Sequence, residues 1–347
     1  MSLFSRKSSL FATDILNNEV IIRERLKNSK VLIIGAAGSI GQATVKEIFK
    51  RDPKKLDVID ISENNLVELV RDIRSSYTDI STEFRTFVID VGTRIFDVFI
   101  ANEGPYDYVF NLSALKHVRS EKDPYTLMRM LEVNIFNCNK ILNFLNKSST
   151  YNYFCVSTDK AANPVNLMGA SKKIMEMYLL NHSLKQKVTL ARFANVAFSD
   201  GSLLYGLQNR INKNQPISCP TDIKRYFISD SESGELCLLS GLLGEDKNIF
   251  FPKLTKDFKL YSFELLVRKF VQSKGYEVHE CSSEQEAINK SKELISKKKW
   301  PCYFFKSDTT GEKHYEEFFT STEEIDANRF KTIGVIINEK SLDKKVL

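Results

Sequence analysis

Short apolar runs alternate along the chain with longer segments in which apolar residues recur every three or four positions. The runs lie at residues 30–35, 56–60, 84–90, 106–112, 151–157 and 188–193. Apolar runs of this length that end in a loop predict β-strands. The longer segments, at residues 62–76, 123–145 and 168–182, predict helices between the strands. Because strands separated by helices favour right-handed crossovers, the pattern predicts an α/β fold with a doubly wound parallel sheet that helices cover on both faces.

The alternation weakens beyond about Asp200. One more helix and one more strand are predicted at residues 231–244 and 248–251, and a helix-rich region follows, with a helix near residues 282–299. We find no repeat and no low-complexity linker. The expected boundaries are residues 28–198 with 228–252 for a large domain, 199–227 with 253–347 for a smaller, mainly helical lobe, and 1–27 for an N-terminal helical extension.

Composition narrows the class of protein. Of the 347 residues, 42% are hydrophobic and 27% are charged, a balance typical of a globular protein with a sizeable core. No apolar run approaches the roughly 18 residues of a membrane-spanning helix, and the N-terminal residues lack the pattern of a leader peptide. We therefore expect a cytoplasmic protein without a membrane span. The formal charge of +6 comes from dispersed basic residues, so we expect a phosphorylated ligand and no nucleic acid.

Cysteine and histidine usage indicates neither disulfides nor a metal. The six cysteines are scattered without a CxxC pair, and no two of the four histidines stand at metal-ligand spacing. We expect reduced thiols and no metal site.

A glycine motif, GAAGSIG, follows the first predicted strand. Gly35, Gly38 and Gly41 permit a tight turn, close approach of the backbone to a pyrophosphate and close helix packing. The helix that opens at Ser39 and Ile40 presents N–H groups to the anion. The spacing is GxxGxxG, whereas the commoner dinucleotide-binding motif is GxGxxG.

An acidic residue, Asp60, ends the next predicted strand. A carboxylate at this point accepts hydrogen bonds from the adenosine ribose and repels a 2′-phosphate, which favours NAD over NADP. Asp90 closes the third strand, where Asp90 and Val91 border the adenine or only form a turn.

Two loops should flank the nicotinamide, because ligands of a doubly wound sheet lie beyond the carboxyl ends of the strands. They are residues 111–118 and 157–164. In the first loop we assign Ser113, Ala114 and Lys116 to the cofactor, and Lys116 also to the substrate.

Met168 stands four residues before Lys172, so the two residues share one face of the predicted helix. In isolation a methionine indicates core packing. That interpretation does not prevent Met168 from lining the site.

Five segments carry a resemblance to a known family. In this order, ALKHV (114–118), STDKAANPVNLMGASKK (157–173), RFANV (192–196), GS (201–202) and RYF (225–227) resemble the extended short-chain dehydrogenase/reductase family, in its CapD-like branch of nucleotide-sugar 4,6-dehydratases. The similarity covers roughly residues 28–255. It is closest to bacterial UDP-N-acetylglucosamine 4,6-dehydratases, which include members with Met in place of the active-site Tyr. The resemblance implies a Rossmann-type fold, a tightly bound and recycled NAD, and a homo-oligomer.

The resemblance also implies a reaction. NAD⁺ takes hydride from C4 of a UDP-activated amino sugar, water leaves across C5 and C6, and NADH returns hydride to C6. Lys160 is the candidate base for C5 if it is neutral, and Asp159 is the candidate acid for the C6 hydroxyl if it is protonated. The two residues can instead form a structural ion pair. Thr158 is the candidate relay for the C4 hydroxyl proton toward Lys172, whose family role is to hold the nicotinamide ribose.

Three further positions relate to the substrate. Asn195 matches the family position that meets the diphosphate, and the planar guanidinium of Arg225 suits phosphate or uracil recognition. The polar loop at residues 307–313 either closes over the sugar or is an ordinary exposed turn.

Two alternatives stay open. One is a nucleotide-sugar 4-epimerase, which needs neither a C5 base nor a C6 acid. The other is a catalytically inactive NAD-binding sensor or scaffold, which the replacement of Tyr by Met168 favours.

Overall fold

The computed structural model describes residues 6, 8–78, 80–146, 149–181, 186–307 and 316–338. The expected substrate loop at residues 307–313 therefore lies, beyond Ser307, outside the described residues. The chain divides into two compact units. The large unit comprises Leu10–Phe193, Asp230–Lys253 and Glu317–Leu347, and the small unit comprises Met1–Ser9, Ala194–Ser229 and Leu254–Glu316.

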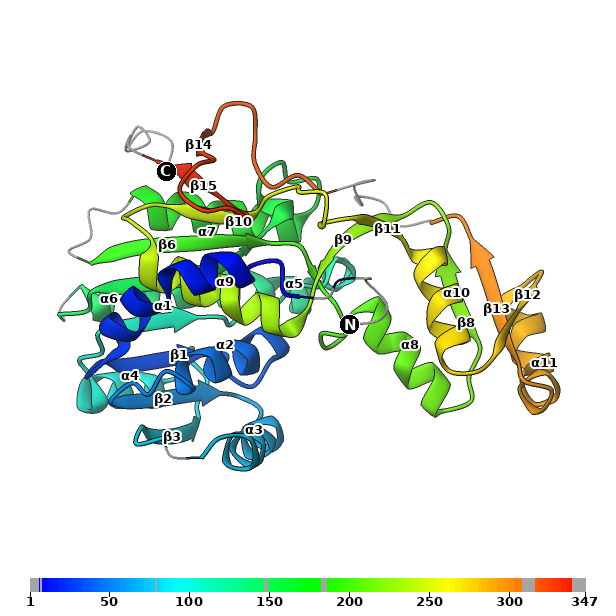
Figure 1. Ribbon diagram of the computed structural model, residues 1–347, viewed down its shortest axis with the longest axis horizontal. Coiled ribbons are helices and arrows are strands. Elements are labelled where there is room, and N and C mark those ends of the chain that lie inside the picture. The colour runs from blue at the N-terminus through cyan, green and yellow to red at the C-terminus, as the bar shows by residue number, and fades with distance from the viewer. Residues whose placement is uncertain are drawn as a thin grey trace. The chain divides into compact units, whose positions relative to one another are not determined.

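A nine-stranded sheet forms the centre of the large unit (Figure 1), in the order β14-β15-β10-β6-β5-β4-β1-β2-β3. Its strands are β1 (Lys30–Ile34), β2 (Lys55–Asp60), β3 (Glu83–Val88), β4 (Tyr108–Asn111), β5 (Asn152–Thr158), β6 (Lys187–Phe193), β10 (Ile249–Pro252), β14 (Glu324–Asp326) and β15 (Ile333–Ile337). The strands from β3 to β10 pair in parallel, whereas β15 pairs antiparallel with β10 and with β14. The predicted doubly wound sheet is confirmed, and its strand order reverses between β1 and β4.

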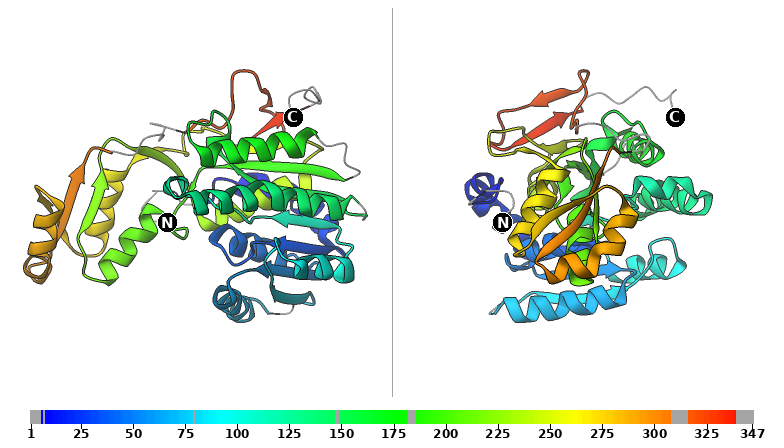
Figure 2. Two further views of the ribbon diagram at one scale, coloured as in Figure 1. Left: turned by 180° about the vertical axis from the view of Figure 1, so that it is seen from behind. Right: turned by 90° about the vertical axis from the view of Figure 1, so that its right-hand side faces the viewer.

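Helices cover both faces of this sheet. They are α1 (Ala12–Leu26), α2 (Ser39–Phe49), α3 (Glu63–Ser76), α4 (Arg94–Glu103), α5 (Pro124–Leu131), α6 (Asn137–Leu145), α7 (Leu167–Asn181) and α9 (Asp230–Leu243), with short turns η2 (Val118–Lys122), η3 (Glu132–Phe136) and η4 (Asp159–Ala161). Figures 1 and 2 show α1, α2 and α9 over one face and α6 and α7 over the other. Helix α9 packs closely against its neighbours at two glycines. A Cβ on Gly234 would lie 2.5 Å from the Ala43 carbonyl oxygen, and a Cβ on Gly241 would lie 2.2 Å from the Phe110 ring.

The helix expected over residues 123–145 is interrupted. Helix α5 passes into the π-helical turn η3 before α6 begins. Such a turn adds one residue to the helical repeat and often marks a functional site. Here it carries Asn134, whose side chain is fully buried.

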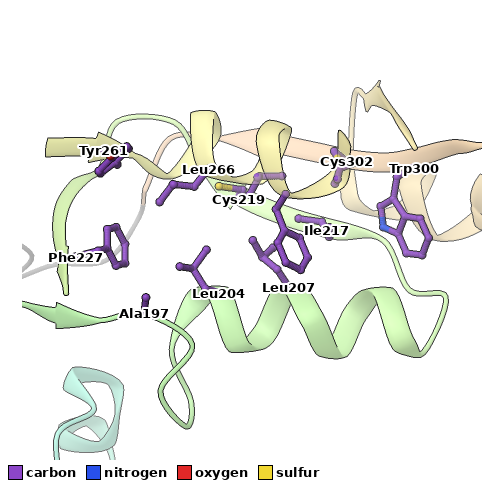
Figure 3. Close-up of a cluster of buried hydrophobic side chains, with 13 residues drawn as sticks. Ala197, Leu204, Leu207, Ile217, Cys219, Phe227, Tyr261, Leu266, Trp300 and Cys302 are labelled. Carbon is purple, nitrogen blue, oxygen red and sulfur yellow. The ribbon is translucent and has the colours of Figure 1, made fainter. Parts of the chain in front are cut away.

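The small unit contains two three-stranded sheets, ordered β11-β9-β7 and β12-β13-β8. Its elements are β7 (Asn195–Val196), α8 (Leu203–Asn212), β8 (Ile217–Pro220), β9 (Lys224–Ile228), β11 (Leu260–Ser262), α10 (Phe263–Ser273), β12 (Glu277–Cys281), α11 (Glu284–Ser296) and β13 (Lys299–Phe305). Figure 3 shows Leu204 and Leu207 of α8 pointing toward Leu266 of α10 in its buried core. The helices of this unit, α8, α10 and α11, are accompanied by two small sheets that the sequence analysis did not identify.

The unit boundaries differ from the expected ones at both ends of the chain. Helix α1 and residues 317–338 belong with the large unit. The reason is local: the buried carboxylate of Asp14 accepts hydrogen bonds from the N–H groups of Lys331 and Thr332, at 2.7 and 2.8 Å. Among the described residues, no helix combines the length and the apolar character needed to cross a bilayer.

Candidate active site

The glycine loop between β1 and α2 leaves space for an anion. Gly35 has a φ of +75°, and a Cβ there would lie 2.7 Å from the Ser113 backbone nitrogen. A Cβ on Gly41 would lie 2.2 Å from the Gly35 carbonyl oxygen, so the fold itself requires these two glycines. A Cβ on Gly38 would have no described neighbour nearer than 3.9 Å. The open side of Gly38 lies at the N-terminus of α2, next to Ser39 and Ile40, where the loop can cradle a pyrophosphate.

Asp60 ties this loop to the end of β2. Its Oδ2 accepts from the Ala37 N–H at 2.9 Å, and its Oδ1 accepts from the Ser62 N–H at 2.9 Å. The carboxylate is half-buried, at the strand end where we expect the adenosine ribose.

The end of β3 combines a turn with an ion pair. Asp90 Oδ1 accepts from the Gly92 N–H at 2.8 Å, and Asp90 Oδ2 lies 2.6 Å from Arg129 Nη2. Val91 is buried beside it. The turn role that we held open for Asp90 is thus present, and the Arg129 partner is an addition.

Asn134 fixes the loop after β4, which carries Ser113, Ala114 and Lys116. Its Oδ1 accepts from the Leu115 N–H and its Nδ2 donates to the Leu115 carbonyl, both at 3.0 Å. The same Nδ2 donates to Ser171 Oγ at 3.0 Å. One buried amide therefore joins this loop to helix α7.

Thr158, Asp159 and Lys160 meet at the carboxyl end of β5. The Thr158 hydroxyl donates to Asp159 Oδ1 at 2.8 Å, and Lys160 Nζ donates to the same oxygen at 3.1 Å. The 3₁₀ turn η4 brings the side chains of Asp159 and Lys160 to one side. In a β-strand, the side chains of two consecutive residues would point to opposite faces. The Asp159 side chain is 5% exposed and that of Lys160 is 26% exposed. The ion pair that we considered as an alternative is therefore present.

Lys172 projects from α7 toward the same strand. Its side chain is buried, and Nζ donates to the Val156 carbonyl at 3.0 Å and to Met175 Sδ at 3.6 Å. Met175 Sδ also accepts from Cys155 Sγ, which lies 3.9 Å from Cys138 Sγ. The hydrogen bond between these thiols lowers the pKa of Cys138 and raises that of Cys155. Lys172 is thus held by one carbonyl and a cluster of sulfur atoms.

Met168 is buried in the first turn of α7. Its N–H donates to Glu121 Oε2 at 3.1 Å, and the Gly169 N–H donates to Asn166 Oδ1 at 2.8 Å. Acceptors at a helix N-terminus satisfy N–H groups that have no partner within the helix. Glu121 and Asn166 therefore fix the turn that carries Met168.

A buried ionic network supports the strand ends below Thr158. Ser157 Oγ donates to Glu176 Oε1 at 2.6 Å, and the fully buried Arg192 donates to Glu176 at 2.8 and 2.9 Å and to Glu323 at 2.7 and 2.8 Å. Burial alone would lower the pKa of Arg192, but the two carboxylates raise it above its ordinary value. The network thus holds Arg192 as a cation and fixes the residue before Thr158.

In the small unit, Asn195 of β7 and Arg225 of β9 lie around one carboxylate. Glu316 accepts a hydrogen bond from Asn195 Nδ2 and others from the Tyr226 N–H, at 3.2 and 3.3 Å. Arg225 Nε lies 3.8 Å from Glu316 Oε1. The two predicted substrate residues are therefore close together, with an acidic neighbour that the prediction did not include.

Sequence reasoning missed the residues that hold the others in place. Asn134 interrupts an apolar helical stretch, a signal of a buried polar group that we did not use. Glu121, Glu176 and Glu316 gave no comparable signal, because their partners lie 47, 16 and 121 residues away in sequence.

Comparison with known proteins shows the family and the fold of this chain. Residues 31–338 match the model of a family described as polysaccharide biosynthesis protein. The chain is 28% identical over 279 residues to the capsular polysaccharide biosynthesis protein CapD of Staphylococcus aureus, over 79% of this chain and 45% of CapD. It therefore spans less than half of the length of that relative.

Two other relatives have enzymatic names. The UDP-N-acetylglucosamine 4,6-dehydratase (inverting) of Campylobacter jejuni is 26% identical over 233 residues, which cover 65% of this chain and 66% of that enzyme. The UDP-glucose 4-epimerase of Rickettsia bellii is 27% identical over 315 residues, which cover 84% and 78%. Among solved structures, Pen from Bacillus thuringiensis shares the fold, with a TM-score of 0.73 at 22% identity over 90% of this chain and 89% of Pen.

Proposed function

The chain belongs to the polysaccharide biosynthesis protein family, and on that premise we propose that it is an NAD-dependent nucleotide-sugar 4,6-dehydratase acting on UDP-N-acetylglucosamine. The product is the UDP-2-acetamido-2,6-dideoxy-4-hexulose. The observation that carries the proposal is the shared oxygen, Asp159 Oδ1, which accepts hydrogen bonds from both Thr158 and Lys160. The named dehydratase relative supports the same reaction.

NAD, when bound, supplies the oxidant for C4 and the reductant for C6. The open side of Gly38 supports a pyrophosphate site, and Asp60 is suited to the adenosine ribose. Lys172 is proposed to hold the nicotinamide ribose, and the loop of Ser113, Ala114 and Lys116 to border the nicotinamide.

The Asp159–Lys160 pair suggests how both residues could reach the protonation states that the proposed reaction needs. In the ion pair, Lys160 is an ammonium and Asp159 a carboxylate, so neither is ready to act. Transfer of one proton along the 3.1 Å hydrogen bond produces a neutral amine and a carboxylic acid together. Lys160 then takes the C5 proton, and Asp159 protonates the C6 hydroxyl, which leaves as water. After C6 has received its hydride, the Lys160 ammonium returns a proton to C5. The Lys160 side chain is 26% exposed, so a proton from solvent, equal to the one released from the C4 hydroxyl, restores the ammonium–carboxylate pair.

Thr158 is the proposed partner for the C4 hydroxyl. Its hydroxyl donates to Asp159 Oδ1, and its oxygen accepts from the Lys160 backbone N–H at 3.4 Å, which leaves one lone pair to accept a proton from the sugar. The proton then passes toward Lys172. In this scheme Met168 has no role in proton transfer and packs the first turn of α7.

Replacing Met168 by Tyr tests that view. Because Met168 is 2% exposed, the larger ring should overpack the site and destabilise the protein by about 1–3 kcal/mol. We expect lower turnover with NAD binding retained. A Tyr variant that turns over faster than the wild type would show that the site still accommodates the phenol as a base.

The epimerase remains a second candidate, because a 4-epimerase relative covers more of this chain than the dehydratase relative. Against it, epimerisation at C4 gives Asp159 and Lys160 no task. The inactive sensor and the homo-oligomer also stay predictions.

Mass spectrometry with NMR of the product separates these functions. The protein is incubated with NAD⁺ and UDP-N-acetylglucosamine. Loss of one water with a C4 ketone or its hydrate would establish the dehydratase. An unchanged mass with a new C4 epimer would establish the epimerase, and NAD binding without conversion would favour the sensor.

A further inference from the structure

In the small unit, a buried carboxylate, Glu316, contacts Asn195 and Arg225, the two residues that we expect to bind the substrate diphosphate. The side chains of Glu316 and Arg225 are 1% and 7% exposed. Glu316 contacts the amide of Asn195, the N–H of Tyr226 and the guanidinium of Arg225. An amide, a backbone N–H and a guanidinium therefore converge on a single anion.

This donor set does not distinguish a carboxylate from a phosphate. Both anions accept hydrogen bonds from guanidinium groups and from backbone and amide N–H groups. The donors that now bind the Glu316 carboxylate could therefore also bind a phosphate group from a ligand.

The ion pair inside the site is loosely made. Charge-assisted N–H···O bonds measure about 2.7–2.9 Å, whereas Arg225 Nε lies 3.8 Å from Glu316 Oε1. Arg225 Nη1 donates to the Lys224 carbonyl at 2.8 Å. A buried ion pair repays the cost of desolvation only when its geometry is good. A diphosphate offers more charge and more acceptor oxygens to the same donors.

We propose that Glu316 is an internal occupant of the nucleotide-diphosphate site, and that a nucleoside diphosphate displaces its carboxylate from Asn195, Tyr226 and Arg225 on binding. This inference rests on the proposed function, because it takes the substrate to be a nucleotide sugar. In the free protein, the Glu316 carboxylate lies beside the buried guanidinium of Arg225 and adds a negative charge there. In return, it lowers the affinity for the nucleotide by the free energy of its own displacement.

Isothermal titration with UDP tests this without turnover. Glu316→Gln keeps the shape and can still accept from the Tyr226 N–H, but it no longer competes as an anion. We expect it to bind UDP at least tenfold more tightly than the wild type, which corresponds to about 1.4 kcal/mol. Glu280→Gln, which removes the same charge from a 61% exposed side chain of β12, should change the affinity less than twofold.

A second variant and a second measurement guard against misfolding. Glu316→Asp keeps the charge but shortens the side chain, so it should also tighten UDP binding. In thermal unfolding, Glu316→Gln without ligand should melt below the wild type, because the buried Arg225 guanidinium has lost one nearby carboxylate. UDP should raise the Tm of this variant by more than it raises that of the wild type. Weaker or unchanged UDP binding in both variants would overturn the inference.

The titration separates this inference from the proposed function. Turnover of the nucleotide sugar by the wild type, without tighter UDP binding in the variants, would reject only the internal occupant. Failure of every variant and the wild type to bind UDP would reject the inference and the nucleotide-sugar function together.

Discussion

Replacing Asp159 by Asn should stop water elimination while leaving the fold intact. Asparagine has nearly the same shape, and its amide oxygen can still accept from Thr158 or from Lys160. It cannot donate the proton that the C6 hydroxyl needs, and it cannot exchange a proton with Lys160. Because the Lys160 side chain is 26% exposed, water can solvate the ammonium after the counter-charge is lost. We therefore expect a change in Tm of only a few degrees.

The effect on rate should be large. A positioned general acid or base contributes about 10²- to 10⁴-fold, which corresponds to roughly 3–5 kcal/mol of activation free energy. Asp159 is proposed to protonate the leaving hydroxyl and to set the protonation of Lys160, so the loss should lie toward the upper end. The effect should fall on kcat, because the proposed role of Asp159 is to protonate the C6 hydroxyl and not to bind the nucleotide.

The assay follows dehydration by mass spectrometry in deuterated water. The 4,6-dehydrated product should form at least 100-fold more slowly in Asp159→Asn than in the wild type. Glu68→Gln removes one charge from a 70% exposed side chain of α3 and should keep the wild-type rate within twofold. Dehydration by Asp159→Asn at more than a tenth of the wild-type rate would refute the role of Asp159 as the acid.

Other predictions concern the cofactor loop and the supporting network. Gly41→Ala should lower the Tm and abolish NAD binding, since its Cβ would lie 2.2 Å from a backbone oxygen. Gly38→Ala, whose Cβ would have no described neighbour nearer than 3.9 Å, should keep the Tm of the wild type and lower only the affinity for NAD, measured by titration. Glu176→Ala removes one carboxylate from the buried Arg192 and should lower the free energy of unfolding in urea by about 3–5 kcal/mol. A loss of less than about 1 kcal/mol would contradict this. Burial would raise the pKa of Glu323, but Arg192 lowers it overall, so its stabilising effect is present above the unfolded pKa and is lost as the pH falls through the folded one. Glu323→Gln should therefore flatten the fall in Tm below about pH 4.5, and an unchanged acid limb would contradict this.

The sequence alone indicated the parallel part of the sheet in the large unit, but not β14 and β15, which the structure adds to that sheet. Five of the six predicted strands, β1, β2, β4, β5 and β6, are largely buried strands of a parallel sheet, and such strands are mostly apolar. The sixth, β3, is a partly exposed edge strand. The glycine loop, Asp60 and the Thr158–Lys160 segment were also predicted, because each lies directly after a strand, where the fold places ligands. Features that depend on residues close together in the sequence can therefore be predicted from the sequence alone.

Only the tertiary structure decided how these residues are held. Whether Asp159 and Lys160 face each other depends on η4, a turn of three residues that leaves no periodic signal. Asn134 joins a loop to α7, and Glu316 joins β7 to β9 from 121 residues beyond Asn195. The strands of the small unit were not identified from the sequence; all but the seven-residue β13 have five residues or fewer, too few to show a clear alternation. Contacts between residues far apart in the sequence leave no pattern along the chain. The network around Arg192 and the contacts of Glu316 both depend on such contacts.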